Sequence, residues 1–146
     1  MGVQTSKQEV KTKNAAHKLL SQEEQEYVGH ISTDELAELM ENSPETLRIL
    51  NCTVKTGPHI SDPFVEHAKT HIKGAQFFDM ILCTDTNSQI PYMMPGQGYF
   101  IQLMKSQDIR KTHTVVVYET GKGFFAERAA FMFTIFGHPN VKVLDG

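Results

Sequence analysis

The chain has 146 residues and a formal net charge of −3, from 14 lysines and arginines against 17 aspartates and glutamates. A chain of this length usually forms one domain and buries roughly two thirds of its unfolded surface. The slight acidic excess argues against nucleic-acid binding, which requires a basic surface. No apolar run approaches the ~20 residues that a membrane-spanning helix needs.

The only two cysteines, Cys52 and Cys83, lie inside apolar stretches. This placement favours buried thiols of a reducing compartment over a disulfide framework. The sequence has no Cys-x-x-Cys pair and no Cys/His spacing of a metal site, and its seven histidines are scattered. We therefore expect no metal and no cofactor.

The first 26 residues form a polar extension. They begin Met1-Gly2-Val3-Gln4-Thr5-Ser6, which matches the pattern for myristoylation of Gly2, although so short a pattern also occurs by chance. One myristoyl chain gives only a weak membrane tether. Small apolar residues at positions 15, 16, 19 and 20 suit either a short amphipathic helix or a frayed tail. The extension lacks arginine, unlike a mitochondrial transit peptide, so we expect a cytoplasmic protein, membrane- or assembly-associated if Gly2 is acylated.

An α/β pattern starts at Tyr27 and defines a domain over residues 27–146. A first short strand is expected over Tyr27–Ile31, and Ser32-Thr33-Asp34-Glu35 reads as a capping box that begins a helix. A mostly apolar strand follows over Leu47–Cys52. Asp62 can then cap a helix that has Pro63 at its first position and runs to about Lys69.

The second half of the domain repeats this alternation. The expected elements are a third strand within His71–Asp79, an irregular segment over 80–97, a helix over Tyr99–Ser106, a strand over Thr114–Tyr118, an apolar helix that Gly137 ends, and a last strand over Val141–Asp145. In the Tyr99–Ser106 helix, Phe100, Ile101 and Met104 are expected to face inward. Alternating strands and helices predict a sheet of about five short parallel strands with right-handed crossovers.

One loop has the position of an active site. It joins the strand Thr114–Tyr118 to the apolar helix, and such loops lie at the carboxyl edge of a parallel sheet, where ligands bind. Its residues are Glu119, Thr120, Gly121, Lys122, Gly123 and Phe124. The loop has no cysteine, serine, histidine or aspartate, and hence no nucleophile. Lys122 is a candidate to bind an anion together with the helix N-terminus, the alternative being a solvated surface lysine.

Several segments, taken in order, resemble a rhodanese domain. The motifs are Leu50-Asn51-Cys52-Thr53, Phe64, His71-Ile72-Lys73-Gly74-Ala75-Gln76-Phe77-Phe78-Asp79, Cys83-Thr84-Asp85, Met94-Pro95, Val115-Val116-Val117-Tyr118, Ala126-x-Arg128 and Phe136-Gly137-His138 with Val141-x-Val143-Leu144-Asp145-Gly146. Over Val28–Asp145 the chain is similar to the N-terminal half of the two-domain thiosulfate/3-mercaptopyruvate sulfurtransferases.

This resemblance implies a fold with a division of labour. In that family the C-terminal domain carries the catalytic cysteine at the first position of the strand-to-helix loop, where it forms a persulfide. The N-terminal domain has no such cysteine and packs against the active one. The present chain departs from the pattern at Lys73, where proline is usual, and it ends at Gly146, before the usual final helix. Without that helix, an apolar face would be left for a partner, a second copy or more of a longer chain.

Other residues offer weaker candidates for chemistry. Of the two thiols, Cys83 is the better alternative and Cys52 the poorer one. Both are weak candidates, since neither stands at a helix N-terminus facing the loop. Arg128 is expected to pair with an acid such as Asp79 rather than to bind substrate. A phosphatase would use the same type of loop but also needs the cysteine, so that interpretation is rejected.

Two functions remain open. The first is a catalytically silent rhodanese-like module that binds a protein partner in a larger assembly, with a weak membrane tether through Gly2 and no role in nucleic-acid binding. The second is the non-catalytic half of a thiosulfate/3-mercaptopyruvate sulfurtransferase, whose active cysteine domain lies on another chain or beyond Gly146.

Overall fold

The computed structural model describes residues 28–58, 61–121 and 123–146. Its elements are β1 (Gly29–Ser32), α2 (Thr33–Asn42), the 3₁₀ turn η1 (Pro44–Thr46), β2 (Leu47–Asn51), α3 (Pro63–Lys69), β3 (Gln76–Phe77), α4 (Gln97–Ser106), β4 (Thr114–Tyr118), α5 (Phe125–Ile135) and β5 (Val141–Asp145). The strands form one sheet in the order β1-β5-β4-β2-β3, and every neighbouring pair is parallel. The predicted α/β fold with five short parallel strands is confirmed.

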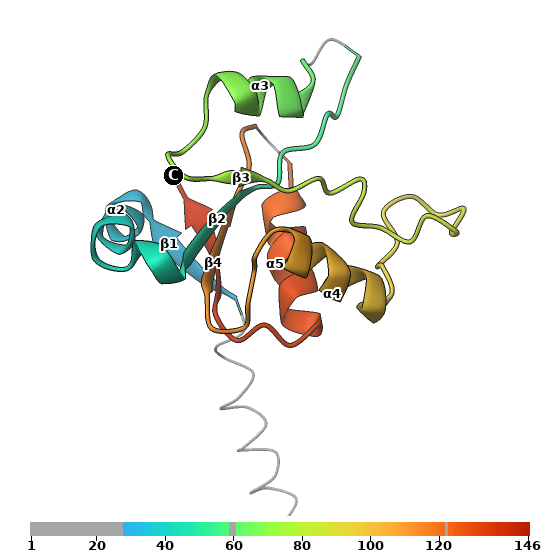
Figure 1. Ribbon diagram of the computed structural model, residues 1–146. Coiled ribbons are helices and arrows are strands. Elements are labelled where there is room, and N and C mark those ends of the chain that lie inside the picture. The colour runs from blue at the N-terminus through green and yellow to red at the C-terminus, as the bar shows by residue number, and fades with distance from the viewer. Residues whose placement is uncertain (1–27, 59–60, 122) are drawn as a thin grey trace, which may run out of the picture.

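The helices cover the sheet from two sides (Figure 1). Helices α4 and α5 lie together on one face, α2 lies on the other, and α3 lies beyond the carboxyl edge. The central strand β4 supplies both cores, because successive side chains of a strand point to opposite faces. Val115 and Val117 pack in the cluster that holds α4 and α5, whereas Val116 and Tyr118 pack in the cluster that holds α2.

Local sequence signals set two helix starts as predicted. At α2 the Glu35 N–H donates to Ser32 Oγ at 3.2 Å, and the Ser32 N–H donates to Glu35 Oε2 at 2.8 Å, which completes a capping box. At α3 the Asp62 carboxylate accepts from the N–H groups of Phe64 and Val65, with Pro63 at the first helical position. Just beyond α5, Gly137 has a φ of +78°, the left-handed conformation typical of the residue after a helix.

The structure corrects two of the predicted details. Strand β1 extends to Ser32, one residue beyond the expected end, and the expected start at Tyr27 lies outside the described residues. Strand β3 lies within His71–Asp79 as predicted and has two residues, and just beyond it the Phe78 N–H still donates to the Asn51 carbonyl of β2. Ile101 is 43% exposed and does not face inward, since only Phe100 and Met104, four positions apart, share the buried side of α4.

Two further observations bear on function. Among the described residues, no helix combines the length and apolar composition that crossing a bilayer requires. The N-terminal extension, and with it Gly2, lies outside the part of the chain that the structure describes.

Candidate functional site

The loop after β4 is tied to the segment after β2, at the carboxyl edge of the sheet. Thr120 N–H donates to Thr53 Oγ1 at 2.9 Å, and the two hydroxyl oxygens lie 3.2 Å apart. Thr53 in turn donates from both its N–H and its hydroxyl to Asn51 Oδ1, at 3.1 and 2.6 Å. Because β2 and β4 are neighbours in the sheet, these bonds fix the start of the loop against the adjacent strand.

Glu119 occupies the N-terminus of α5. The Phe125 N–H donates to Glu119 Oε1 at 3.1 Å, and the Ala126 N–H also bonds to this carboxyl group. Burial raises the pKa of Glu119, while these two backbone hydrogen bonds lower it in part. The free N–H groups at a helix N-terminus are where an external anion would bind. In this chain an internal carboxylate already accepts from them.

Gly123 makes room for that carboxylate. A Cβ at position 123 would stand 2.3 Å from Glu119 Oε2, well inside van der Waals contact. The loop residues that the structure describes therefore form a closed arrangement around Glu119. Lys122, the predicted anion ligand, lies outside the described residues, and Phe124, the last residue before α5, projects into solvent.

The two thiols lie away from the loop surface. Cys83 is fully buried, with its Sγ 3.4 Å from Met132 Sδ, and burial raises its pKa to about 12 even though Arg128 acts to lower it. Cys52 is also fully buried, and burial raises the pKa of its thiol well above the usual value, with a further contribution from the charge of Glu119. A reactive cysteine needs exposure and a lowered pKa, and neither thiol has them.

Arg128 does not pair with Asp79, so that prediction was wrong. No ion pair among the described residues joins them; Arg128 Nη2 donates instead to the Tyr92 carbonyl, and Arg128 Nε is buried without a partner. Asp79 Oδ1 accepts from the N–H groups of Ile81 and Leu82 at 2.9 and 3.1 Å. The carboxylate therefore holds its own turn, and the arginine anchors the irregular segment over 80–97 to α5.

The sequence interpretation missed a pair of histidines at the end of α3. The rings of His67 and His71 stack with centroids 4.3 Å apart, and the signal was their spacing of four residues at the end of a helix. Asn51 Oδ1 is taken by Thr53, so its amide nitrogen must donate to His67 Nδ1, at 3.2 Å. His67 therefore carries its proton on Nε2 and has no free lone pair for a metal. No cluster of three or more potential metal ligands occurs among the described residues.

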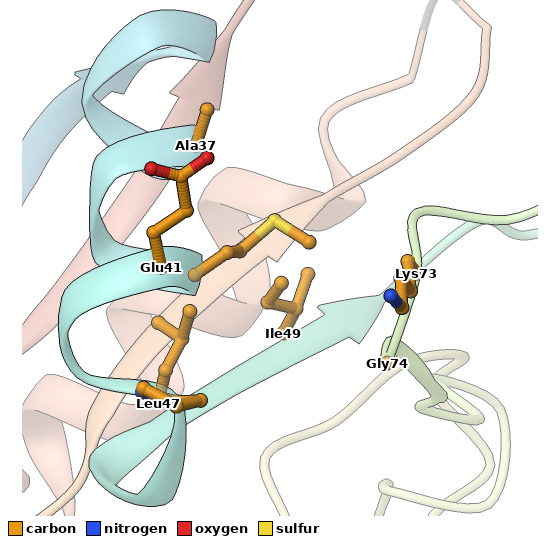
Figure 2. Close-up of a pocket in the computed structure, with 8 residues that line it drawn as sticks. Ala37, Glu41, Leu47, Ile49, Lys73 and Gly74 are labelled. Atoms are coloured by element: carbon orange, nitrogen blue, oxygen red, sulfur yellow. The ribbon is translucent and has the colours of Figure 1, made fainter.

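A cavity of about 430 Å³ lies on the α2 face of the sheet. Figure 2 shows the labelled residues around it, which are Ala37 and Glu41 of α2, Leu47 and Ile49 of β2, and Lys73 and Gly74 before β3. Met40 and Pro44 complete a mostly apolar lining, with Glu41 and Lys73 as its charged side chains. The cavity is thus a mostly apolar hollow between α2 and the sheet.

A second apolar surface runs along the outside of α5 and is called the α5 stripe. It consists of Phe124, Phe131 and Ile135, which are 81%, 53% and 54% exposed and fall on one helix face together with Arg128. The bond from Arg128 to the Tyr92 carbonyl joins the stripe to the segment over 80–97. That segment adds exposed Ile81, Leu82, Ile90 and Met93.

Comparison with known proteins agrees with this architecture. The sequence model of the Rhodanese-like domain family matches residues 32–146. Thiosulfate sulfurtransferase of Cricetulus griseus is 34% identical over 124 residues, which cover 82% of this chain and 41% of that protein.

Two solved structures are similar as well. SseA from Escherichia coli, a 3-mercaptopyruvate sulfotransferase, matches with a TM-score of 0.72 and 28% identity over 80% of this chain and 44% of SseA. The sub-stoichiometric sulfur transferase subunit of yeast mitochondrial complex I matches with a TM-score of 0.70 and 27% identity over 81% of this chain and 39% of that subunit.

These matches cover most of this chain but less than half the length of each relative. The TM-scores of 0.70 and 0.72 show that the fold is shared with these structures. The chain belongs to the rhodanese-like domain family and is related to the thiosulfate and 3-mercaptopyruvate sulfurtransferases.

Proposed function

We propose that this chain is a catalytically silent rhodanese-like module that acts by binding a protein partner in a larger assembly. The observation that carries the proposal is the identity of the residue at the first loop position. In the catalytic C-terminal domain of the sulfurtransferases a persulfide-forming cysteine starts the corresponding loop, whereas here Glu119 starts it and accepts hydrogen bonds from the N–H groups at the α5 N-terminus. Cys52 and Cys83 are both buried, so neither supplies a substitute nucleophile.

The α5 stripe supports a binding role. Large apolar side chains that are exposed in a row, and joined to a further apolar segment, are typical of a protein interface. One similar structure is a subunit of yeast mitochondrial complex I, which is a further reason to expect that this chain joins an assembly. Membership of complex I itself is a property of the yeast protein.

The second candidate is the non-catalytic half of a thiosulfate/3-mercaptopyruvate sulfurtransferase. The active cysteine domain would then lie on another chain or beyond Gly146. In favour of this candidate, the chain spans only 41% of the length of the Cricetulus griseus enzyme, about one domain of two. Under either candidate, a myristoyl group on Gly2 would add a weak tether that holds a cytoplasmic protein at a membrane.

A sulfur-transfer assay on the purified 146-residue chain tests catalytic silence. Thiosulfate and 3-mercaptopyruvate serve as donors, with cyanide and a small thiol as acceptors. We expect no sulfur transfer above the uncatalysed rate. The Cys52→Ser and Cys83→Ser variants should give the same rate as the parent chain. Transfer that either variant abolishes would overturn the proposal.

The partner surface is tested separately, with a tagged chain isolated from its native source. We expect Phe131→Glu to reduce the co-purifying partner at least tenfold without lowering the melting temperature, because a charge in an apolar interface is costly to desolvate. Gln102→Glu, an exposed change on α4, is the matched control and should retain the partner. Equal recovery with both variants would exclude the α5 stripe as the interface. The intact mass of the native protein then separates the two candidates, since a second domain beyond Gly146 favours the sulfurtransferase half.

A further inference from the structure

A cavity of about 340 Å³ lies at the amino edge of the sheet, opposite the loop that contains Glu119. It opens between α4, the turn that leads from α4 into β4, and the C-terminal end of α5. None of the residues that line it belongs to the loop that contains Glu119 or to the α5 stripe. The cavity is therefore independent of the function proposed above.

The floor of this cavity is apolar and firmly packed. Phe100 and Phe136 stack with ring centroids 4.4 Å apart, and the buried side chains of Met104 and Ile109 lie beside them. His138 completes the wall, but its Nε2 donates to the His113 carbonyl at 2.9 Å. One of the two ring nitrogens of His138 is thus already bonded within the protein.

The rim is basic. Lys105, Arg110 and Lys111 all line the cavity, and the nearby acid Asp108 is already bonded to Arg48 and Arg110 at 2.9 Å each. None of the ion pairs among the described residues involves Lys105 or Lys111. Lys111 extends over the end of α5, where its Nζ would lie 3.7 Å from a Cβ on Gly137. Two cations therefore stand at the mouth of an apolar cavity without a counter-charge.

We propose that this cavity binds a single-chain amphipathic carboxylate, such as a medium-chain fatty acid. The hydrocarbon tail would cover the Phe100–Phe136 floor, at about 0.8 kcal/mol for each buried CH₂ group. The carboxylate would bind Lys105 and Lys111 in charge-assisted hydrogen bonds. A volume near the low end of the ligand-pocket range, about 300–1,000 Å³, favours a medium chain over a long one.

The lining argues against other ligand classes. A nucleotide or sugar phosphate would need polar donors in the depth of the site, where the described side chains are aromatic and aliphatic. The acyl chain of a myristoylated Gly2 would end in an amide and leave the two lysines without an anion. The basic rim therefore favours a free carboxylate.

Calorimetric titration of the 146-residue chain with dodecanoate, below its micellar concentration, tests the proposal, with dodecanol as the neutral ligand of equal chain length. We expect saturable binding at one site, with dodecanoate at least tenfold tighter than dodecanol. The double change Lys105→Glu and Lys111→Glu should weaken dodecanoate about tenfold and change dodecanol less than twofold. Ile101→Asn at the rim should weaken both ligands, because it removes apolar contact common to them.

Lys55→Glu is the control for general charge, since Lys55 is exposed and follows β2 at the opposite edge of the sheet. This variant should bind both ligands like the parent. Circular dichroism and thermal melting should show every variant folded, since positions 55, 101, 105 and 111 are all exposed.

Four results would overturn the proposal, and the first three concern the ligand and the lysines. They are absence of saturable binding, equal affinity for dodecanoate and dodecanol, and equal weakening by Lys55→Glu and the double lysine variant. Loss of dodecanoate binding in chain acylated at Gly2, with binding kept in Gly2→Ala, would assign the cavity to the chain's own acyl group and would also overturn it.

Discussion

Glu119 and its hydrogen bonds to α5 explain how a loop in the position of an active site can be stable without a ligand. The helix N-terminus carries a partial positive charge and unsatisfied N–H groups, which a carboxylate satisfies as well as a bound anion does. The carboxylate depends on Gly123 for space and on the Phe125 N–H for a hydrogen bond. Both dependences can be tested with single substitutions.

The first prediction concerns Glu119→Cys. A thiol at this position would face the α5 N-terminus, which lowers the pKa of a cysteine. We expect its alkylation by iodoacetamide to reach half its maximal rate at a lower pH than for Ser106→Cys, an exposed thiol at the C-terminal end of α4. The buried Cys52 and Cys83 should label far more slowly than either. Equal midpoints for the two introduced thiols would show that the helix N-terminus does not act on position 119.

The second prediction concerns Gly123→Ala. The added Cβ would displace the Glu119 carboxylate, so we expect a loss of about 1–2 kcal/mol in the free energy of unfolding, from the hydrogen bonds given up. In a chain that already carries Glu119→Ala, the same change should cost less, because no carboxylate remains to displace. Urea unfolding of the four proteins gives the coupling energy, and additive effects would contradict the contact.

Gly98→Ala is the matched control for that cycle. Gly98 lies in α4, and nothing stands within 4 Å of an added Cβ. Alanine there should stabilise the protein by roughly 0.5–1 kcal/mol, because it restricts the unfolded chain without a clash.

At the scale of elements, the capping box at Ser32 makes the third prediction. Ser32→Ala removes the oxygen that accepts from the Glu35 N–H, so we expect the free energy of unfolding to fall by about 1 kcal/mol. Ser43→Ala is the comparison, since the Ser43 side chain makes no capping bond at η1 and its loss should cost little. Chemical unfolding measures both, and a larger loss for Ser43→Ala would contradict this account of α2.

The elements that were predictable from the sequence are those with local signals. The capping box, Asp62-Pro63 and Gly137 each set an end through contacts within a few residues, so their positions could be predicted without knowledge of the fold. The partner of Arg128 could not be, because it is the Tyr92 carbonyl, 36 residues away in the sequence. The loop that contains Glu119 could be predicted only in part. The sequence showed that the loop has no nucleophile, but not that the Glu119 carboxylate accepts a hydrogen bond from the Phe125 N–H.

At the scale of the whole molecule, buried histidines link stability to pH. Burial lowers the pKa of both His138 and His113, and the charge of Arg48 lowers that of His113 further. The unfolded chain, whose histidines have a pKa of about 6.5, therefore takes up protons before the folded chain does. Stability from these groups is complete above about pH 7 and is lost as the pH falls below 6.5 and through their lower folded pKa values.

The fourth prediction follows from this expected loss of stability at low pH. Urea unfolding from about pH 7.5 to about pH 5.5 should show a falling free energy of unfolding, and His138→Gln should reduce the fall, because glutamine keeps an N–H donor for the His113 carbonyl but does not titrate. His30→Gln, an exposed change on β1, should keep the parent's pH dependence. If His138→Gln loses as much stability on acidification as the parent, His138 is not a source of the pH dependence of the free energy of unfolding.

The two edge strands of the sheet are short: β1 has four residues and β3 has two. An edge strand recruits other chains through its row of unpaired backbone N–H and C=O groups, and such short edges offer few of them. Addition of a partner's strand is therefore disfavoured at β1 and at β3, whereas beside β3 the residues Leu47–Ile49 of β2 have no strand partner on that side among the described residues. At these two edge strands recognition is left to side chains, which can be changed one at a time, so specificity there can diverge while the backbone of the fold stays the same.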